Sequence, residues 1–166
     1  MKVIGALLVV LAGWWLGRSL ADPYRQRIKC LEQGLGLLDQ LRSEIGWHRR
    51  VLTEAFLRAS LSYPAYGPMA EYLSQQIMDH EDDFPTAFHN ALNRVPGLWD
   101  KDREIWGNLA QVIGKSSVDY ELDYMQGTHE ELARQLVEAR TQGLKTARML
   151  EVLVSLTGVA IVVVLI

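Results

Sequence analysis

The residues best suited to chemistry are Gly114, Lys115 and Ser116, which match the last three positions of a phosphate-binding loop. Such a loop also needs a glycine five residues before Gly114, and Leu109 occupies that position. It needs a preceding strand as well, whereas the sequence before Gly114 predicts a helix. We therefore interpret this tripeptide as the end of one helix, with Ser116 and Ser117 capping the next.

Metal chemistry has equally little support in the sequence. The four histidines form no HExxH motif and no pair at i, i+4; they are His48, His80, His89 and His129. His129 falls on the apolar face of a predicted helix, so we expect it to be a hydrogen-bonded packing residue. No serine elbow and no dinucleotide fingerprint is present. The sequence therefore predicts a protein that is not an enzyme and uses no metal or cofactor.

The longest predicted element is the last one, a helix from Asp119 to Ile166. Apolar or small residues recur on one face in steps of mostly three and four, as expected of a helix packed along its length. These are Leu122, Met125, His129, Leu132, Leu136, Ala139, Gly143, Ala147, Leu150 and Val154. No charged residue follows Val152, so we expect the end of this helix to lie in a membrane.

A second uncharged run lies near the N-terminus, from Val3 to Gly17. It could be a signal peptide cleaved after Ala21, or a retained membrane helix. The pair Trp14 and Trp15 favours the retained helix, because tryptophan suits the membrane interface. We therefore predict a transmembrane anchor at residues 1–21, a helical domain at 22–148 and a second transmembrane segment at 149–166.

The charges beside these two segments predict their orientation. Basic residues follow the first segment and precede the second; they are Arg18, Arg25, Arg27, Lys29, Arg140, Lys145 and Arg148. Because basic residues favour the cytoplasmic side, we expect the 22–148 domain in the cytoplasm of a two-pass membrane protein. The single cysteine, Cys30, agrees weakly with a reducing compartment.

The overall charge limits the possible partners. The formal net charge is −3 and the pI is about 5.8, which argues against a nucleic-acid-binding protein. The acidic stretches 80–83 and 100–104 either bind a basic partner or are simply solvated helix ends and loops.

The 22–148 domain reads as an all-α bundle, with about six helices in all. Asp22-Pro23 predicts a helix restart or a kink. Helices are then expected over 22–47, 53–61, 69–77, 84–92 and from Asp100 or Asp102 to about 113, with a loop at 63–68. No stretch alternates at period two, so no strand is predicted.

Two patterns of small residues predict close helix packing near the membrane. Gly13 and Gly17 are four residues apart in the first segment, and Ala139, Gly143 and Ala147 follow the same spacing before the second. Small side chains let two helix backbones approach closely.

The chain resembles the stage III sporulation protein AB family. The matching features are the opening KVIGALLVVLAGWWLGRSLADPYRQR, the segment Leu109–Ser117, and the long helix that runs into a terminal apolar segment. The sequence departs from the family where an L-G-x-S-D turn is common, because it reads Ile-Gly-Lys-Ser-Ser at 113–117.

The resemblance implies a role in the channel or secretion-like complex that links mother cell and forespore. It implies a body similar to the cytoplasmic domain of type II secretion F proteins, placed in the mother-cell membrane. The implied partners are the ATPase named stage III sporulation protein AA and other membrane subunits. The turn farthest from both membrane segments, with Trp47, Arg49 and Arg50, is either a contact for that ATPase or a solvated loop with Trp47 packed in the core.

An alternative of a different class stays open. The same pattern of two membrane segments and a helical body would suit a ligand-sensing module whose body lies outside the cytoplasm. A reporter placed between Pro64 and Ala65 would distinguish the two topologies.

Overall fold

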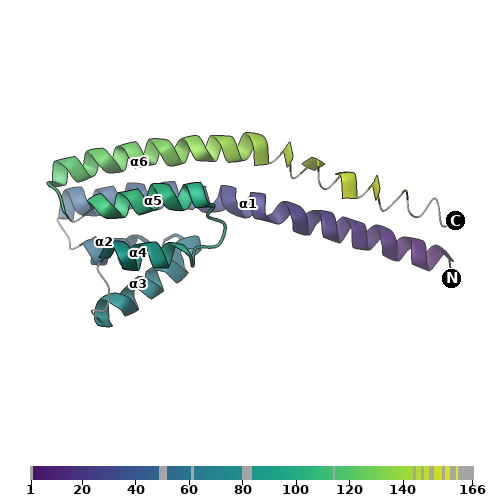
Figure 1. Cartoon of the computed structure of the whole chain (residues 1–166), viewed down its shortest axis with the longest axis horizontal. Helices are drawn as coiled ribbons and strands as arrows, with labels where there is room; N and C mark the ends of the chain where they lie inside the picture. The colour runs from purple at the N-terminus through teal and green to yellow at the C-terminus, as the bar shows by residue number, and fades with distance from the viewer. Residues whose placement is uncertain are drawn as a thin grey trace. The chain divides into compact units, whose positions relative to one another are not determined.

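The computed structural model describes residues 2–48, 52–60, 62–79, 84–113 and 115–143, with short stretches 145–146, 148–149, 152–154 and 156–157 and residue 160 (Figure 1). These described residues form six α-helices, one 3₁₀-helix and one π-helix, and no strand occurs among them. The predicted all-α class is confirmed.

Helix α1 spans Lys2–His48 and contains Pro23 in its interior. The helix restart predicted at Asp22-Pro23 is therefore wrong. A proline inside a helix removes one backbone hydrogen bond and costs about 3 kcal/mol. Local contacts offset part of this cost, since Asp22 pairs with Arg25 at 3.7 Å across the proline and Ala21 is fully buried.

The next helices follow the predicted order. They are α2 (Leu52–Ser60), η1 (Pro64–Tyr66), α3 (Gly67–Asp79), α4 (Phe84–Leu92) and α5 (Asp100–Val112). The loop predicted at 63–68 is wrong in part, because η1 and the first turn of α3 occupy it. Pro64 and Pro68 fit this structure, because each lies in the first turn of its helix, where a proline is tolerated. The break after α4 is a turn in which Gly97 has φ 91°, a conformation that favours glycine.

Helix α6 spans Val118–Glu138 and is followed by a π-helix, η2 (Ala139–Gly143). The chain predicted to be helical from Asp119 onward therefore stays helical through η2, but as a π-helix there. On the predicted apolar face, Met125, Leu132 and Leu136 are buried. Leu122 and His129 are half-buried, whereas Ala147 and Leu150 lie outside the described residues. The predicted segment 149–166 also falls mostly outside them.

The chain divides into two compact units. Unit 1 comprises Met1–Gln26 with Glu138–Ile166, and unit 2 comprises Arg27–Val137. In unit 1, Gly143 of η2 lies against Tyr24 of α1, since a Cβ at Gly143 would be 3.4 Å from the Tyr24 ring. No helix among the described residues combines the length and the apolar character that crossing a membrane requires.

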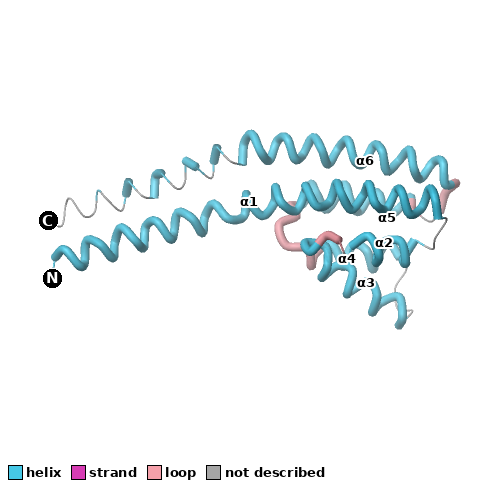
Figure 2. Tube along the Cα trace, turned by 180° about the vertical axis from the view of Figure 1, so that it is seen from behind, coloured by secondary structure: helices cyan, strands magenta, loops and turns pink. Residues whose placement is uncertain are grey.

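Helices α1 and α5 lie in the middle of unit 2, which both views show (Figures 1 and 2). Helix α6 lies along α5 and the part of α1 that begins at Arg27. On the other side of α1 and α5 lie α2, α3 and α4, and each of these packs on the next helix in the chain. The η1 turn is tied to α1, because the Ala65 N–H donates to Gln33 Oε1 at 2.8 Å.

The apolar centre of unit 2 is an aromatic cluster of Phe56, Tyr66, Phe84, Phe88 and Trp106. Ring centroids lie 5.4 Å apart in the edge-to-face pair Phe56–Phe88 and 5.6 Å apart in Tyr66–Trp106. Offset and edge-to-face rings at these separations stabilise beyond their area alone. This cluster holds α2, α4, α5 and η1 together.

Two glycines let α1 reach this centre. A Cβ at Gly34 would overlap the Tyr66 hydroxyl and lie 3.2 Å from its ring, and a Cβ at Gly36 would lie 2.7 Å from the Tyr63 ring. Glycine in the middle of a helix costs roughly 0.5–1 kcal/mol relative to alanine. Here the missing side chains leave room for two tyrosines.

Candidate functional site

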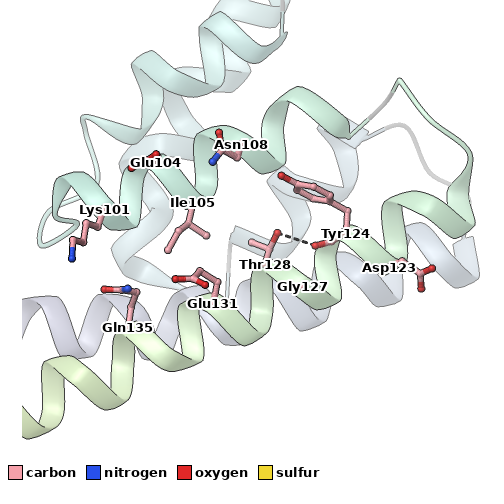
Figure 3. A pocket seen from close by; sticks show the side chains of 10 residues that line it. All are labelled: Lys101, Glu104, Ile105, Asn108, Asp123, Tyr124, Gly127, Thr128, Glu131 and Gln135. Atoms are coloured by element: carbon pink, nitrogen blue, oxygen red, sulfur yellow. Dashed lines mark hydrogen bonds between the residues drawn. The ribbon is translucent and has the colours of Figure 1, made fainter.

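A groove of about 720 Å³ lies between α5 and α6 (Figure 3). We call it the α5–α6 groove. Helix α5 contributes Lys101, Glu104, Ile105 and Asn108, and α6 contributes Asp123, Tyr124, Gly127, Thr128, Glu131 and Gln135. Its volume is in the range usual for ligand pockets.

The charges along this groove are mainly negative. Glu104, Asp123 and Glu131 bring three carboxylates, against one ammonium group from Lys101. Arg134, one turn from Glu131, forms an ion pair with it on the outer side of α6. The groove therefore presents a net negative surface.

The middle of the groove is open and combines an apolar side chain with a carboxylate. Ile105 and Glu131 point toward each other from opposite walls, and the Tyr124 ring extends toward α5 below Asn108 (Figure 3). The hydroxyl of Thr128 donates to the Tyr124 carbonyl at 2.9 Å, so this threonine is satisfied within α6. Gly127 has no side chain, so it leaves the space between the two walls of the groove open.

A buried polar cluster lies behind the groove and joins three helices. Arg27 of α1 donates from Nε and from one terminal nitrogen to the two Asp102 oxygens, each at 2.9 Å. The same terminal nitrogen donates to Gln135 Oε1 of α6 at 3.1 Å. Asp102 is fully buried, and Arg27 and Gln135 are buried as well. A two-point arginine–carboxylate pair sets the relative position of its helices in both distance and angle.

Asp102 also caps its own helix. Its Oδ2 accepts from the Trp99 N–H at 3.0 Å, which satisfies a backbone donor at the start of α5. The Trp99 ring lies over the Arg27 guanidinium, 4.3 Å from its carbon, and shields one face of the ion pair. One carboxylate thus fixes the start of α5 and attaches it to α1.

Sequence reasoning missed this cluster. Arg27 counted as part of the basic flank of a membrane segment, and Asp102 only as a helix-start residue. Their separation of 75 residues leaves no local pattern that pairs them. The one available signal was Arg27 itself, an arginine one turn before the buried Leu31 on the same helix.

Two further contacts join α1 to α6. Arg42 donates to Gln126 Oε1, and His129 Nε2 lies 3.5 Å from Asp39 Oδ1. His129 is half-buried in this place, so it has the polar partner that the sequence predicted for it. These contacts place the α6 wall of the groove against α1 along its length.

A second groove of about 580 Å³ lies between α4 and α5. Most of its lining residues have polar side chains, among them His89, Asn90, Asn93 and Arg103. Glu104 and Asn108 line both grooves, so the exposed face of α5 forms the ridge between them.

A family model described as stage III sporulation protein AB matches residues 2–166. The chain belongs to this family. It is therefore a component of stage III of sporulation, and the resemblance stated from its sequence is confirmed. Comparison with curated proteins and with solved structures finds no match.

The residues proposed for partner binding in this family member are placed only in part. Trp47 lies in the last turn of α1, while Arg49 and Arg50 lie outside the described residues. Lys115 and Ser116 lie in the turn between α5 and α6, where the Ser116 N–H donates to Glu121 Oε1 at 3.3 Å. The predicted helix end and helix start on either side of this turn are confirmed.

The small residues proposed for helix packing fall at both ends of unit 1. Gly13 and Gly17 lie within α1, and Ala139 and Gly143 are the first and last residues of η2. Both η2 residues are buried, and Gly143 faces Tyr24. Ala147 lies outside the described residues. The prediction that this packing takes place near a membrane stays a prediction.

Proposed function

We propose that this chain is a membrane-anchored, non-enzymatic subunit of a stage III sporulation complex, and that its cytoplasmic body is a platform for the ATPase named stage III sporulation protein AA. The observation that carries the proposal is the family match over residues 2–166. The likeness of the body to type II secretion F proteins, and a channel between mother cell and forespore, come from the resemblance and belong to the proposal.

The membrane anchors rest on the sequence. The run Val3–Gly17 and the residues after Val152 carry no charge, and basic residues stand on the body side of both. A charged residue in the centre of a bilayer is costly, so the absence of charge over these stretches favours insertion. The basic flanks favour a body on the cytoplasmic side.

The platform role rests on chemistry that suits protein contacts more than catalysis. The polar side chains inside unit 2 hold helices together, as in the Arg27–Asp102–Gln135 cluster. The exposed face of α5 and its two grooves offer surface for other proteins. Trp47, Arg49 and Arg50 remain the proposed contact with the ATPase, because tryptophan and arginine are frequent in binding hot spots.

The first test is topology. A reporter inserted between Pro64 and Ala65 in the full chain should report a cytoplasmic location. An external location would contradict the proposal and favour the alternative of a sensing module with an extracytoplasmic body.

The second test is co-purification with the ATPase from sporulating cells. Arg49→Glu with Arg50→Glu should abolish it while membrane insertion and the helical circular dichroism spectrum stay unchanged. The matched control is Arg58→Glu with Lys115→Glu, which reverses two exposed charges elsewhere and should leave co-purification intact. Undiminished co-purification of the first variant would exclude these arginines from the contact.

A further inference from the structure

The described helix glycines of unit 2 differ in what lies beside them. Gly34 and Gly36 are occupied by tyrosines from the same chain, as described above. At Gly127 a Cβ would meet nothing within 4 Å, although the residue lies in the middle of α6. A glycine there destabilises a helix by roughly 0.5–1 kcal/mol relative to alanine. No contact within unit 2 offsets this cost.

Gly127 is also the residue that opens the α5–α6 groove. It lies on the α6 wall between Tyr124 and Glu131, so a larger side chain would project into the space between the walls (Figure 3). A glycine in such a place lets another backbone approach closely, as small residues do in helix–helix contacts.

Charge indicates what approaches. Helix α6 carries six carboxylates and one arginine; the acids are Asp119, Glu121, Asp123, Glu130, Glu131 and Glu138. Glu104 of α5 adds a carboxylate on the opposite wall of the groove. A phosphate backbone or an anionic lipid surface would be repelled here, whereas a segment rich in lysine and arginine would be attracted.

Exposed aromatic side chains continue the groove at the start of α6. Tyr120 is 54% exposed and its ring centroid lies 6.4 Å from that of Tyr124, which lines the groove. Val118 is exposed beside them. Tyrosine is enriched in binding hot spots, where it supplies apolar area and a hydrogen-bonding group together.

We propose that the α5–α6 groove binds a basic amphipathic helix of another protein. The apolar face of that helix packs on Ile105, Tyr124 and Gly127, where its backbone approaches α6. Its lysines and arginines pair with Glu104, Asp123 and Glu131. This is the helix-in-groove mode of recognition. The inference does not require the partner to be the ATPase, and it involves a different surface from Trp47, Arg49 and Arg50.

The test uses the full chain in an uncharged detergent and two fluorescent helical peptides. One peptide is a lysine–leucine amphipathic helix, and the other has glutamate at each lysine position. The lysine peptide should bind and the glutamate peptide should not. Equal binding of both peptides, or no binding of either, would overturn the proposal.

Gly127 variants then locate the binding. Gly127→Phe fills the groove and should weaken lysine-peptide binding by about tenfold or more, the size of a hot-spot loss. Gly127→Ala adds only one methyl group and should weaken binding less than Gly127→Phe, with a raised melting temperature. Gly67→Phe adds the same ring at another open glycine and should leave binding unchanged. If Gly127→Phe, shown to be folded by its melting transition, bound normally, the site would not be this groove.

Charge variants test whether the carboxylates of the groove attract the basic peptide. Glu104→Lys with Asp123→Lys should weaken lysine-peptide binding by about tenfold and reduce its dependence on salt. Glu71→Lys, on the exposed face of α3, is the control. Equal losses in the control would mean that only the overall charge matters, and the proposal would fail.

A last experiment identifies the segment that binds in the groove in sporulating cells. A photo-crosslinking residue at Asn108, which lines the groove and is exposed, is activated in sporulating cells, and the attached segment is sequenced. A basic helical segment of another protein supports the proposal. A lipid, a nucleic acid or an acidic segment overturns it.

Discussion

Unit 2 contains two buried clusters that are stabilised in different ways. The aromatic cluster is stabilised by apolar contacts, and the polar cluster by an ion pair and hydrogen bonds. Helix α5 contributes to both, since Asp102 and Trp106 are one turn apart and each has no exposed surface. Trp106 enters the aromatic cluster, where it contacts the rings of Tyr66 and Phe88. Asp102 enters the polar cluster, where Arg27 pairs with both of its oxygens.

The difference lies in how much geometry each region specifies. Apolar burial stabilises mainly by the area removed from water, and the geometry of a ring pair adds only about 0.5–1.5 kcal/mol, so the aromatic cluster specifies its partners less strictly. A buried carboxylate is tolerated only when its partners are in place, because leaving a charge unpaired there costs several kcal/mol. The aromatic cluster therefore supplies stability, while the polar cluster selects the register of α1, α5 and α6 that forms the groove.

The largest expected effect comes from breaking the polar cluster. Asp102→Ala leaves Arg27 buried without its carboxylate and should reduce the free energy of unfolding by about 3–5 kcal/mol. Arg27→Met combined with Asp102→Leu removes both charges and should recover most of this loss. Denaturant unfolding of the full chain in detergent measures both. A loss under about 1 kcal/mol for Asp102→Ala would show that the pair does not select the register.

A smaller effect is expected where α1 meets the aromatic cluster. Gly34→Ala would normally stabilise a helix, but here the new methyl group overlaps the Tyr66 hydroxyl, so we expect a loss of about 1–3 kcal/mol. Tyr66→Phe removes that oxygen and should relieve the clash. A double-mutant cycle with no favourable coupling between the two changes would contradict the close approach of α1 and η1.

The last expected effect is a dependence of the free energy of unfolding on pH. Burial raises the pKa of the Cys30 thiol from 9.0 to about 11, with a partly opposing hydrogen bond from Tyr66, and burial also raises the pKa of Tyr66. Both groups are therefore neutral in the folded state over a wider range than in the unfolded state. The contribution of Cys30 is complete below about pH 9 and is lost as the pH rises toward 11.

Unfolding measured between pH 8 and 11 should show this loss, on the order of 2 kcal/mol from Cys30 alone. Cys30→Ala should have a shallower pH dependence than the parent chain. An identical dependence in the two proteins would mean that the thiol is not held neutral by burial. Asp102 of the polar cluster adds to this loss, because its charge also raises the pKa values of Cys30 and Tyr66.

Much of the fold of unit 2 could be predicted from the sequence. The helix ends at Val95-Pro96-Gly97 and around Gly114 follow from local chemistry, since proline and glycine favour turns whatever surrounds them. The buried face of α6 was predicted through Met125, Leu132 and Leu136, because a 3.6-residue period is a local property. The all-α class and the helix order needed nothing more than these signals.

Local signals left two features of the helices undecided. The sequence predicted a helix restart or a kink at Pro23, and α1 continues through it without a restart. It predicted a helix beyond Glu138 but not the π-helix η2, in which Gly143 lies against Tyr24. That contact joins residues far apart in the sequence, which a local pattern does not contain.

The sequence by itself determined the class, the order of helices, the apolar faces and, through its family, a place in stage III of sporulation. Only the tertiary structure decided which charged residues become internal. Arg27 and Asp102 read locally as surface residues, and they pair because the fold brings positions 75 residues apart together. The same holds for the groove, since two helices must pack side by side before Gly127 can lie open between them. Helix periodicity is a property of neighbours along the chain, whereas a buried pair and a groove are properties of neighbours in space.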